Sequence, residues 1–213
     1  MVLSGVADGD VGPRASCGSD VLEARRQAIA PGRWRWLRQS HGGGVVLLGA
    51  DEPCAGREGD ALVSTMPGAP LAVFAADCAL VALASPQGIV AAVHVGWRSL
   101  LAGVLESSAT AMGALGATDL AAVLGACIGP ECYEFGESDL EGLEARYGPS
   151  VRSVSAKGAL ALDLRAGVHR ALEAASVRVL VEDGRCGACE PGLFSWRARG
   201  DTGRHALVVT GAR

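Results

Sequence analysis

The sequence predicts an α/β fold with a mixed sheet and an antiparallel central hairpin, in one domain spanning residues 1–213. Short apolar runs alternate with amphipathic helical stretches, which is the pattern of an α/β protein. Two apolar runs within residues 70–97 flank the turn-forming Ser85-Pro86-Gln87-Gly88, and strands joined by so short a turn are antiparallel. The chain has 213 residues, 49% of them hydrophobic, which is enough to bury a sizeable core.

The first half of the chain reads mainly as strands. Residues 1–30 are rich in Gly, Asp and Arg, with a short helix expected around residues 20–30. Residues 33–49 read as strand, loop and strand, because tryptophan alternates with arginine before the Gly42–Gly44 run. A strand is expected within residues 58–68, closed by a Pro-Gly turn, and then the hairpin of residues 70–97.

The second half alternates helices and strands. Apolar spacing predicts one helix over residues 98–115 and two amphipathic helices over residues 138–148 and 162–176. Buried strands are expected over residues 120–130, 177–184 and 205–213, with an irregular segment at residues 185–204. No internal repeat or low-complexity linker divides the chain.

Composition narrows the function classes. The net charge is −4 with no basic patch, which argues against nucleic acid as a partner. The sequence holds no apolar window of about 18 residues, so no transmembrane helix and no membrane partner are expected. The N-terminus lacks the basic start and apolar core of a signal peptide, so we expect a cytoplasmic protein.

The seven cysteines are expected to be free thiols, mostly core fillers, because their number is odd and they are scattered. The Cys186-Gly-Ala-Cys189 pair stands alone, so it is weak support for zinc and reads more simply as a loop with two thiols. Cys127 and Cys132 are either core or site-lining residues.

The loop length of the predicted hairpin decides whether a cysteine and a histidine lie side by side. With a loop of three residues (Ser85–Gln87) or five (Ala84–Gly88), paired residue numbers sum to 172, and Cys78 lies opposite His94 on one face of the sheet. A loop of two or four residues would put them on opposite faces. A paired thiol and imidazole either ligate zinc or act as nucleophile and base, and His41, in a Gly-rich loop, is a candidate third ligand. Of the other histidines, we expect His169 at the surface and His205 in a structural role.

Six short motifs follow one another along residues 39–210. They are Gln39-Ser40-His41-Gly42, Asp60 to Ser64 (DALVS), Ala75 to Cys78 (AADC), His94 to Ser99 (HVGWRS), Leu124 to Gly136 (LGACIGPECYEFG), and Leu193 to Arg204 (LFSWRARGDTGR). This series resembles the YfiH family, also called the laccase-domain or polyphenol oxidase family. Residues 1–30 do not match the N-terminal pattern of that family.

The resemblance implies a layered α-β-β-α fold and zinc ligands at His41, Cys78 and His94, with copper as the alternative metal. Three protein ligands leave a fourth position open, as in catalytic zinc sites. Characterised members are purine nucleoside phosphorylases with adenosine deaminase activity, so the implied partners are phosphate and nucleosides such as adenosine, inosine and methylthioadenosine. No protein partner can be inferred.

The resemblance also suggests roles for individual residues around the metal. Asp77 is a candidate to orient a ligand or act as general acid or base, and Arg98 is a candidate to bind the phosphate and developing charge. Gln39, Arg98, Cys127, Arg197 and Arg204 are candidate substrate-binding residues.

Two other chemistries stay open. A cysteine hydrolase would use Cys78 as nucleophile and His94 as base, and a role in peptidoglycan precursor editing has been proposed within the family. A copper-dependent polyphenol oxidase fits the family name, but a trinuclear copper centre needs more imidazoles than the four histidines present.

Overall fold

The computed structural model describes residues 1–49 and 56–212, and Cys54 lies outside the described residues. A six-stranded mixed sheet forms the centre, in the order β10-β7-β5-β6-β3-β2. Its strands are β2 (Val45–Leu48), β3 (Ala61–Ser64), β5 (Ala79–Ala84), β6 (Val90–Val95), β7 (Ala121–Leu124) and β10 (Arg178–Glu182). The β2–β3 and β7–β10 pairs are parallel, and the pairs between them are antiparallel. The predicted α/β class with an antiparallel central hairpin is therefore confirmed.

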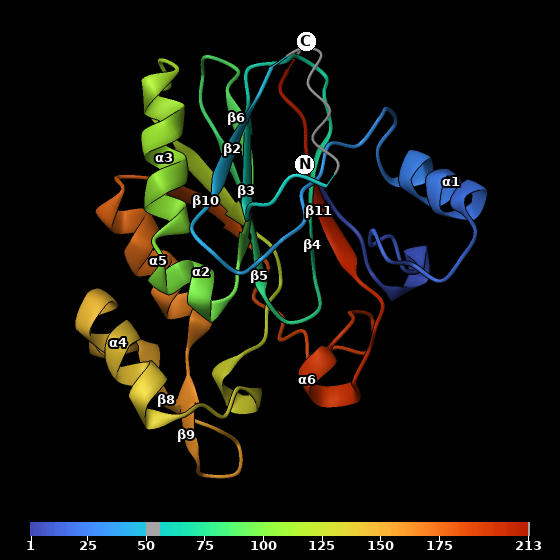
Figure 1. Cartoon of the computed structure of the whole chain (residues 1–213). Helices are drawn as coiled ribbons and strands as arrows, with labels where there is room; N and C mark the ends of the chain where they lie inside the picture. The colour runs from blue at the N-terminus through green and yellow to red at the C-terminus, as the bar shows by residue number, and fades with distance from the viewer. Residues whose placement is uncertain (50–55, 213) are drawn as a thin grey trace.

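The molecule has four layers, as expected for an α-β-β-α fold (Figure 1). Helices cover one face of the six-stranded sheet, and a three-stranded sheet with the order β1-β11-β4 packs on the other. The covering helices are α2 (Trp97–Leu101), α3 (Val104–Ala114) and α5 (Leu164–Ala174), and α4 (Glu137–Tyr147) packs on α2 and α5. The smaller sheet comprises β1 (Val2–Leu3), β4 (Leu71–Ala75) and β11 (His205–Val209), and α1 (Ser19–Ile29) lies outside it.

Three apolar clusters match these layers. The largest joins the helices to the six-stranded sheet, and Leu62, Leu80, Val73 and Leu207 belong to a second cluster between the two sheets. A third cluster, which includes Trp34, packs on the outer face of the small sheet. Successive side chains of a strand point to opposite faces of its sheet, so each strand contributes residues to two clusters.

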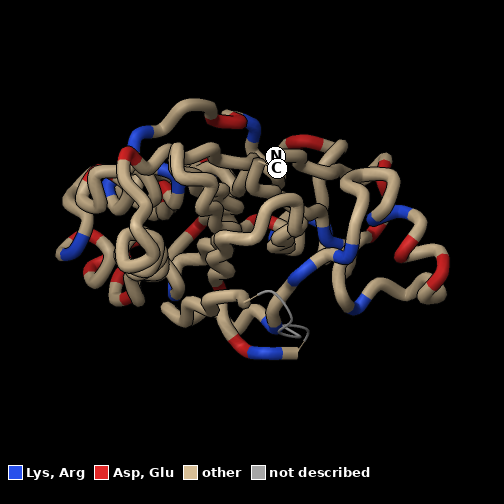
Figure 2. The backbone as a smooth tube through the Cα atoms, turned by 90° about the horizontal axis from the view of Figure 1, so that it is seen from above, with Lys and Arg blue, Asp and Glu red and all other residues tan. Residues whose placement is uncertain are grey.

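The remaining elements are short. The hairpin β8 (Arg152–Val154) and β9 (Leu160–Leu162), the helix α6 (Trp196–Arg199), and the 3-10 turns η1 (Val6–Asp8), η2 (Pro130–Cys132) and η3 (Pro149–Val151) complete the described chain. No described helix is both long and apolar enough to cross a bilayer. Acidic and basic residues are interspersed along the backbone (Figure 2).

The apolar run at residues 70–84 forms two strands, where the sequence predicted one. β4 ends at Ala75, Asp77 takes a left-handed backbone with φ of 97°, and β5 begins at Ala79 in the other sheet. The prediction missed this because apolar residues on both sides hide a change of sheet. The sharp turn places Cys78 at the junction of the two sheets.

The predicted helix over residues 98–115 is also two helices, because Gly103 adopts a left-handed φ of 78° between α2 and α3. The strand expected before His41 is absent as well. Arg35 pairs once with Leu71, and beyond it the Gln39 amide takes both backbone groups of Phe74, at 2.7 and 2.8 Å. The Gln39 side chain therefore makes the hydrogen bonds to β4 that the backbone of a paired strand would make.

The hairpin register differs from the predicted one by two residues. Ser85–Ile89 forms a five-residue loop, so Leu80, and not Cys78, lies opposite His94. Cys78 instead lies at the level of Gly96, just before β5 begins. A shift of two residues keeps the same face, so the Cys78 and His94 side chains still converge.

Candidate functional site

Asp60 organises the loop that carries His41. It lies just before β3 with no exposed surface. Its carboxylate accepts hydrogen bonds from the backbone N–H groups of His41 at 3.0 Å and Gly42 at 2.7 Å. His41 has a φ of 60°, which is uncommon for a residue with a side chain. These bonds hold the Gly-rich loop in one conformation and present the His41 ring.

The same carboxylate orients His94, at the end of β6. The Nδ1 atom of His94 lies 2.8 Å from Oδ1 of Asp60, and both side chains are buried. Burial raises the pKa of Asp60, but the bonds from His94 and Gly42 outweigh it and leave the pKa below its ordinary value. An ionised carboxylate only accepts, so we assign the proton to Nδ1, which leaves Nε2 to act as a ligand.

Cys78 completes the group. Its Sγ lies 3.8 Å from Nε2 of His41, and the ligand atoms of His41, Cys78 and His94 lie within 4.8 Å of one another. Burial opposes ionisation of the thiol, but His94 and His41 outweigh it and lower the pKa of Cys78. Burial likewise disfavours charge on His94, yet the Cys78 sulfur and Asp60 raise its pKa. Each of the two side chains therefore favours the ionised form of the other.

Gly96 leaves the space that these side chains fill. A Cβ atom there would lie 2.8 Å from the His41 ring and 3.1 Å from Sγ of Cys78. Its φ of −83° is ordinary, so this glycine is required for room and not for the turn. Two imidazoles and one thiolate around a compact space fit zinc and also copper. The donor set therefore fits the implied metal.

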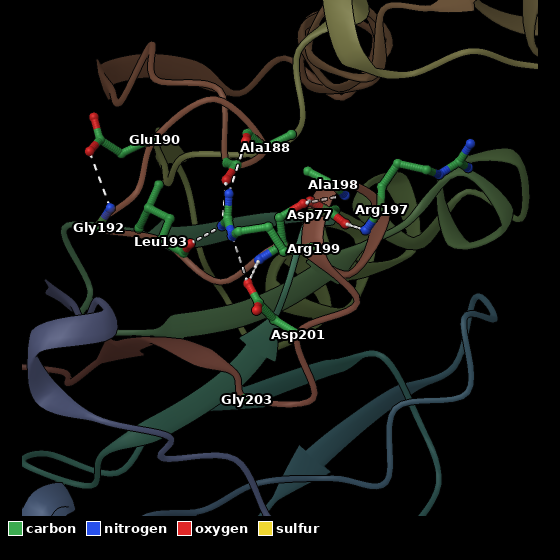
Figure 3. Close-up of polar contacts among 12 residues, drawn as sticks. Asp77, Ala188, Glu190, Gly192, Leu193, Arg197, Ala198, Arg199, Asp201 and Gly203 are labelled. Atoms are coloured by element: carbon green, nitrogen blue, oxygen red, sulfur yellow. Dashed lines mark hydrogen bonds and ion pairs between the residues drawn. The ribbon is translucent and has the colours of Figure 1, made fainter.

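Asp77 has a different environment from the one predicted. Its carboxylate accepts from Oγ of Ser195 at 2.6 Å and from the backbone N–H of Arg197 at 2.7 Å, at the start of α6 (Figure 3). Asp77 thus ties the junction between the sheets to the C-terminal segment. Asp60, which the sequence reasoning did not select, orients the histidine ligand.

Aromatic rings and two arginines lie near the three ligands. Trp97 packs edge-on against Phe135 at 5.4 Å, and Phe135 packs in the same way against Tyr133. The Arg98 guanidinium lies 4.2 Å from the Trp97 ring centre, and that of Arg197 lies 5.0 Å from the Tyr133 ring centre. Burial raises the pKa of Tyr133, and the neighbouring Cys78 and Asp77 raise it further. This placement joins an aromatic surface and cationic groups to the ligand set.

The other predicted substrate contacts have different surroundings. The Gln39 amide is paired with the Phe74 backbone, and Cys127 is buried in the core with its thiol near Arg165. Arg204 donates to the backbone carbonyls of its own loop. These environments favour structural roles for all three.

The other two histidines lie away from the three ligands. His169 is partly exposed and bonds to Glu182, while His205 is buried in β11. Both positions agree with the predictions. The sequence did hold a signal for Asp60: an acidic residue directly before a fully apolar strand, inside one of the quoted motifs.

Comparisons with known proteins identify the family of this chain. The family model described as "Multi-copper polyphenol oxidoreductase laccase" matches residues 18–211. A purine nucleoside phosphorylase of Streptomyces coelicolor is 35% identical over 203 residues, covering 92% of this chain and 83% of the relative. The Escherichia coli purine nucleoside phosphorylase YfiH is 34% identical over 205 residues, covering 92% and 84%. A Mycobacterium tuberculosis relative with the same enzyme name is 36% identical over 177 residues, covering 82% and 70%.

Solved structures show the same fold. YfiH from Bacillus licheniformis has a TM-score of 0.84 with 21% identity, over 96% of this chain and 85% of that one. YlmD from Geobacillus stearothermophilus has a TM-score of 0.83 with 24% identity, over 96% and 85%. The family match over most of the chain and the identities above 30% lead to one assignment: the chain belongs to the laccase-like YfiH family.

Proposed function

We propose that this protein is a zinc-dependent purine nucleoside phosphorylase that also deaminates adenosine. The observation that carries the proposal is the convergence of His41, Cys78 and His94 beside the Trp97, Phe135 and Tyr133 rings and the Arg98 guanidinium. The relatives bearing the phosphorylase name support the substrate class.

The three ligands would hold one zinc ion, which supplies Lewis-acid chemistry when bound. Asp60 holds the proton on Nδ1 of His94 and so keeps Nε2 directed to the metal. The bonds from Asp60 to the His41 loop fix the second imidazole before any ligand binds. The protein residues thus pre-organise the site.

In phosphorolysis, an oxygen of inorganic phosphate forms a bond to C1′ of the ribose as the bond from C1′ to the purine nitrogen breaks. The electron pair leaves with the purine, which takes up a proton. Arg98 would bind the phosphate dianion with a charge-assisted hydrogen bond, and Arg197 is the second cation on this side. The exposed parts of the aromatic rings would stack on the purine.

The test is nucleoside turnover with and without phosphate, before and after removal of metal by a chelator. We expect adenosine and inosine cleavage to require phosphate, and both cleavage and deamination to stop on chelation and return with zinc. Cys78→Ala should be inactive, whereas the matched Cys17→Ala, which changes a thiol in the N-terminal segment, should retain activity. Turnover that survives both chelation and Cys78→Ala would refute the proposal.

A cysteine hydrolase is the second candidate, because the Cys78 thiolate, His94 and Asp60 also form a nucleophile, base and orienting carboxylate. Alkylation separates the two. A zinc-bound Cys78 should react slowly with iodoacetamide and faster after chelation, whereas a free activated thiolate should react quickly without chelator. Fast alkylation together with chelator-insensitive activity would favour the hydrolase.

A further inference from the structure

A second group of metal-ligand side chains lies outside the site described above. Glu131 and Cys132 come from η2, and Cys186 and Cys189 come from the segment that follows β10. One ligand atom from each of the four lies within 4.8 Å of the others. Sγ of Cys132 is 3.3 Å from Sγ of Cys189, and Sγ of Cys189 is 3.7 Å from Oε1 of Glu131. Segments 57 residues apart in sequence therefore meet through three thiols and one carboxylate.

A backbone N–H group of the facing segment points at one sulfur of the cluster. The N–H of Gly129 donates to Sγ of Cys186 at 3.1 Å. Hydrogen bonds from backbone N–H groups to sulfur stabilise its anionic form.

Neighbouring residues fix both halves of the cluster. The N–H of Glu190 donates to the Cys186 carbonyl at 2.9 Å, which closes the turn containing both cysteines. Arg199 donates to the Ala188 carbonyl at 3.0 Å from the other side (Figure 3). On the facing segment, the Glu131 carboxylate folds over Gly129, where a Cβ atom would lie 2.4 Å from its oxygens. A side chain at position 129 would therefore displace the Glu131 carboxylate from this place.

We propose that Glu131, Cys132, Cys186 and Cys189 bind a structural zinc ion. Zinc–sulfur bonds of about 2.3 Å and zinc–oxygen bonds of about 2.1 Å set the edges of a ligand tetrahedron at about 3.8 Å between sulfurs and about 3.6 Å between sulfur and oxygen. The observed sulfur–oxygen distance of 3.7 Å matches its edge, and the sulfur–sulfur distance of 3.3 Å would have to lengthen by about 0.5 Å when zinc binds. Four protein ligands fill the tetrahedron, so this site leaves no position for substrate, unlike the three-ligand site.

The position of the cluster indicates what this zinc would do. The segment after Cys189 carries Ser195 and Arg197, which bond to Asp77 beside Cys78. The segment after Cys132 carries Tyr133, under the Arg197 guanidinium. Zinc would join these two segments at their base and so hold one wall of the candidate active site.

Zinc content of variants purified under reducing conditions tests the proposal. Cys78→Ala removes the first site, so any zinc it retains belongs to the second, whether or not the proposed enzymatic function is correct. We expect Cys78→Ala to retain one equivalent, Cys78→Ala with Cys17→Ala to retain one, and Cys78→Ala with Cys189→Ala to retain none. Cys189 is exposed, so its replacement leaves the core intact.

X-ray absorption at the zinc edge of Cys78→Ala adds a direct reading of the ligands. We expect three sulfur neighbours and one oxygen neighbour. Folded Cys78→Ala without zinc would overturn the proposal, and so would a zinc shell dominated by nitrogen and oxygen. A disulfide between Cys132 and Cys189 that persists in the reduced, zinc-supplied protein would overturn it as well.

Discussion

Replacing Asp60 with asparagine tests the orienting role of its carboxylate. Oδ1 accepts from the His41 N–H and from Nδ1 of His94, and Oδ2 accepts from the Gly42 N–H at 2.7 Å. Whichever way the amide of Asp60→Asn turns, its NH₂ group faces at least one backbone N–H. Each lost bond to a charged acceptor costs about 1.5–3 kcal/mol, so the free energy of unfolding should fall by at least about 1.5 kcal/mol.

Asp60→Asn should also lose zinc affinity, and this loss should not follow from destabilisation alone. Loss of the residue that orients a histidine ligand typically costs about tenfold to hundredfold in metal affinity. The measurement is competition with a chromophoric chelator, made in the Cys189→Ala background so that only the first site is counted. Asp163→Ala is the control for destabilisation, because Asp163 caps α5 through the Ala166 N–H at 2.9 Å. It should lose about 1 kcal/mol of stability and keep its zinc affinity.

The reasoning fails if Asp60→Asn binds zinc within twofold of the parent protein. It also fails if Asp163→Ala loses as much zinc affinity as Asp60→Asn, because the effect would then follow from general destabilisation.

Three further predictions concern single sites. Gly96→Ala should lose zinc measured by elemental analysis, because the added methyl group meets His41 and Sγ of Cys78, while Gly113→Ala, in open space on α3, should keep it. Arg98→Ala should raise the phosphate concentration needed for half-maximal cleavage about tenfold to hundredfold, and an unchanged requirement would remove Arg98 from the site. Burial lowers the pKa of His205 to about 4, and neither ring nitrogen has a hydrogen-bond partner among the described residues. Below about pH 6.5 the unfolded chain binds a proton that the folded chain excludes, so stability falls as the pH drops. Urea unfolding at pH 7 and 4.5 should show the parent losing about 2 kcal/mol more than His205→Leu; equal losses would contradict this.

Local sequence patterns predicted the elements whose packing repeats regularly. The amphipathic spacing of α1, α4 and α5 follows from one apolar face per helix, and the central hairpin follows from its Pro-Gly loop. The pattern failed where a single residue redirects the chain. Asp77 ends one strand and starts another in a different sheet, and Gly103 divides one apolar helical pattern into two helices.

From the residues alone, the sequence predicted only which site residues share one face of the hairpin. For a loop of odd length, parity predicted Cys78 and His94 on one face, and a two-residue error in register does not change that face. The sequence analysis missed the role of Asp60 because its bonds to His41 and His94 join residues 19 and 34 positions away. Asp77 was assigned as a site residue by its position next to Cys78, whereas its partners lie 118 and 120 residues further along the chain. No local pattern carries such pairings.

Those distant partners also connect the two candidate metal sites. Asp77 keeps a left-handed φ of 97°, a costly conformation that persists only where surrounding contacts enforce it. The contacts come from Ser195 and Arg197, in the segment that begins at the Cys186 turn. The backbone that aims Cys78 at the histidines therefore depends on where the C-terminal segment lies. If zinc fixes that segment, Cys189→Ala should weaken zinc binding at the three-ligand site as well, although residue 189 contributes no atom to it.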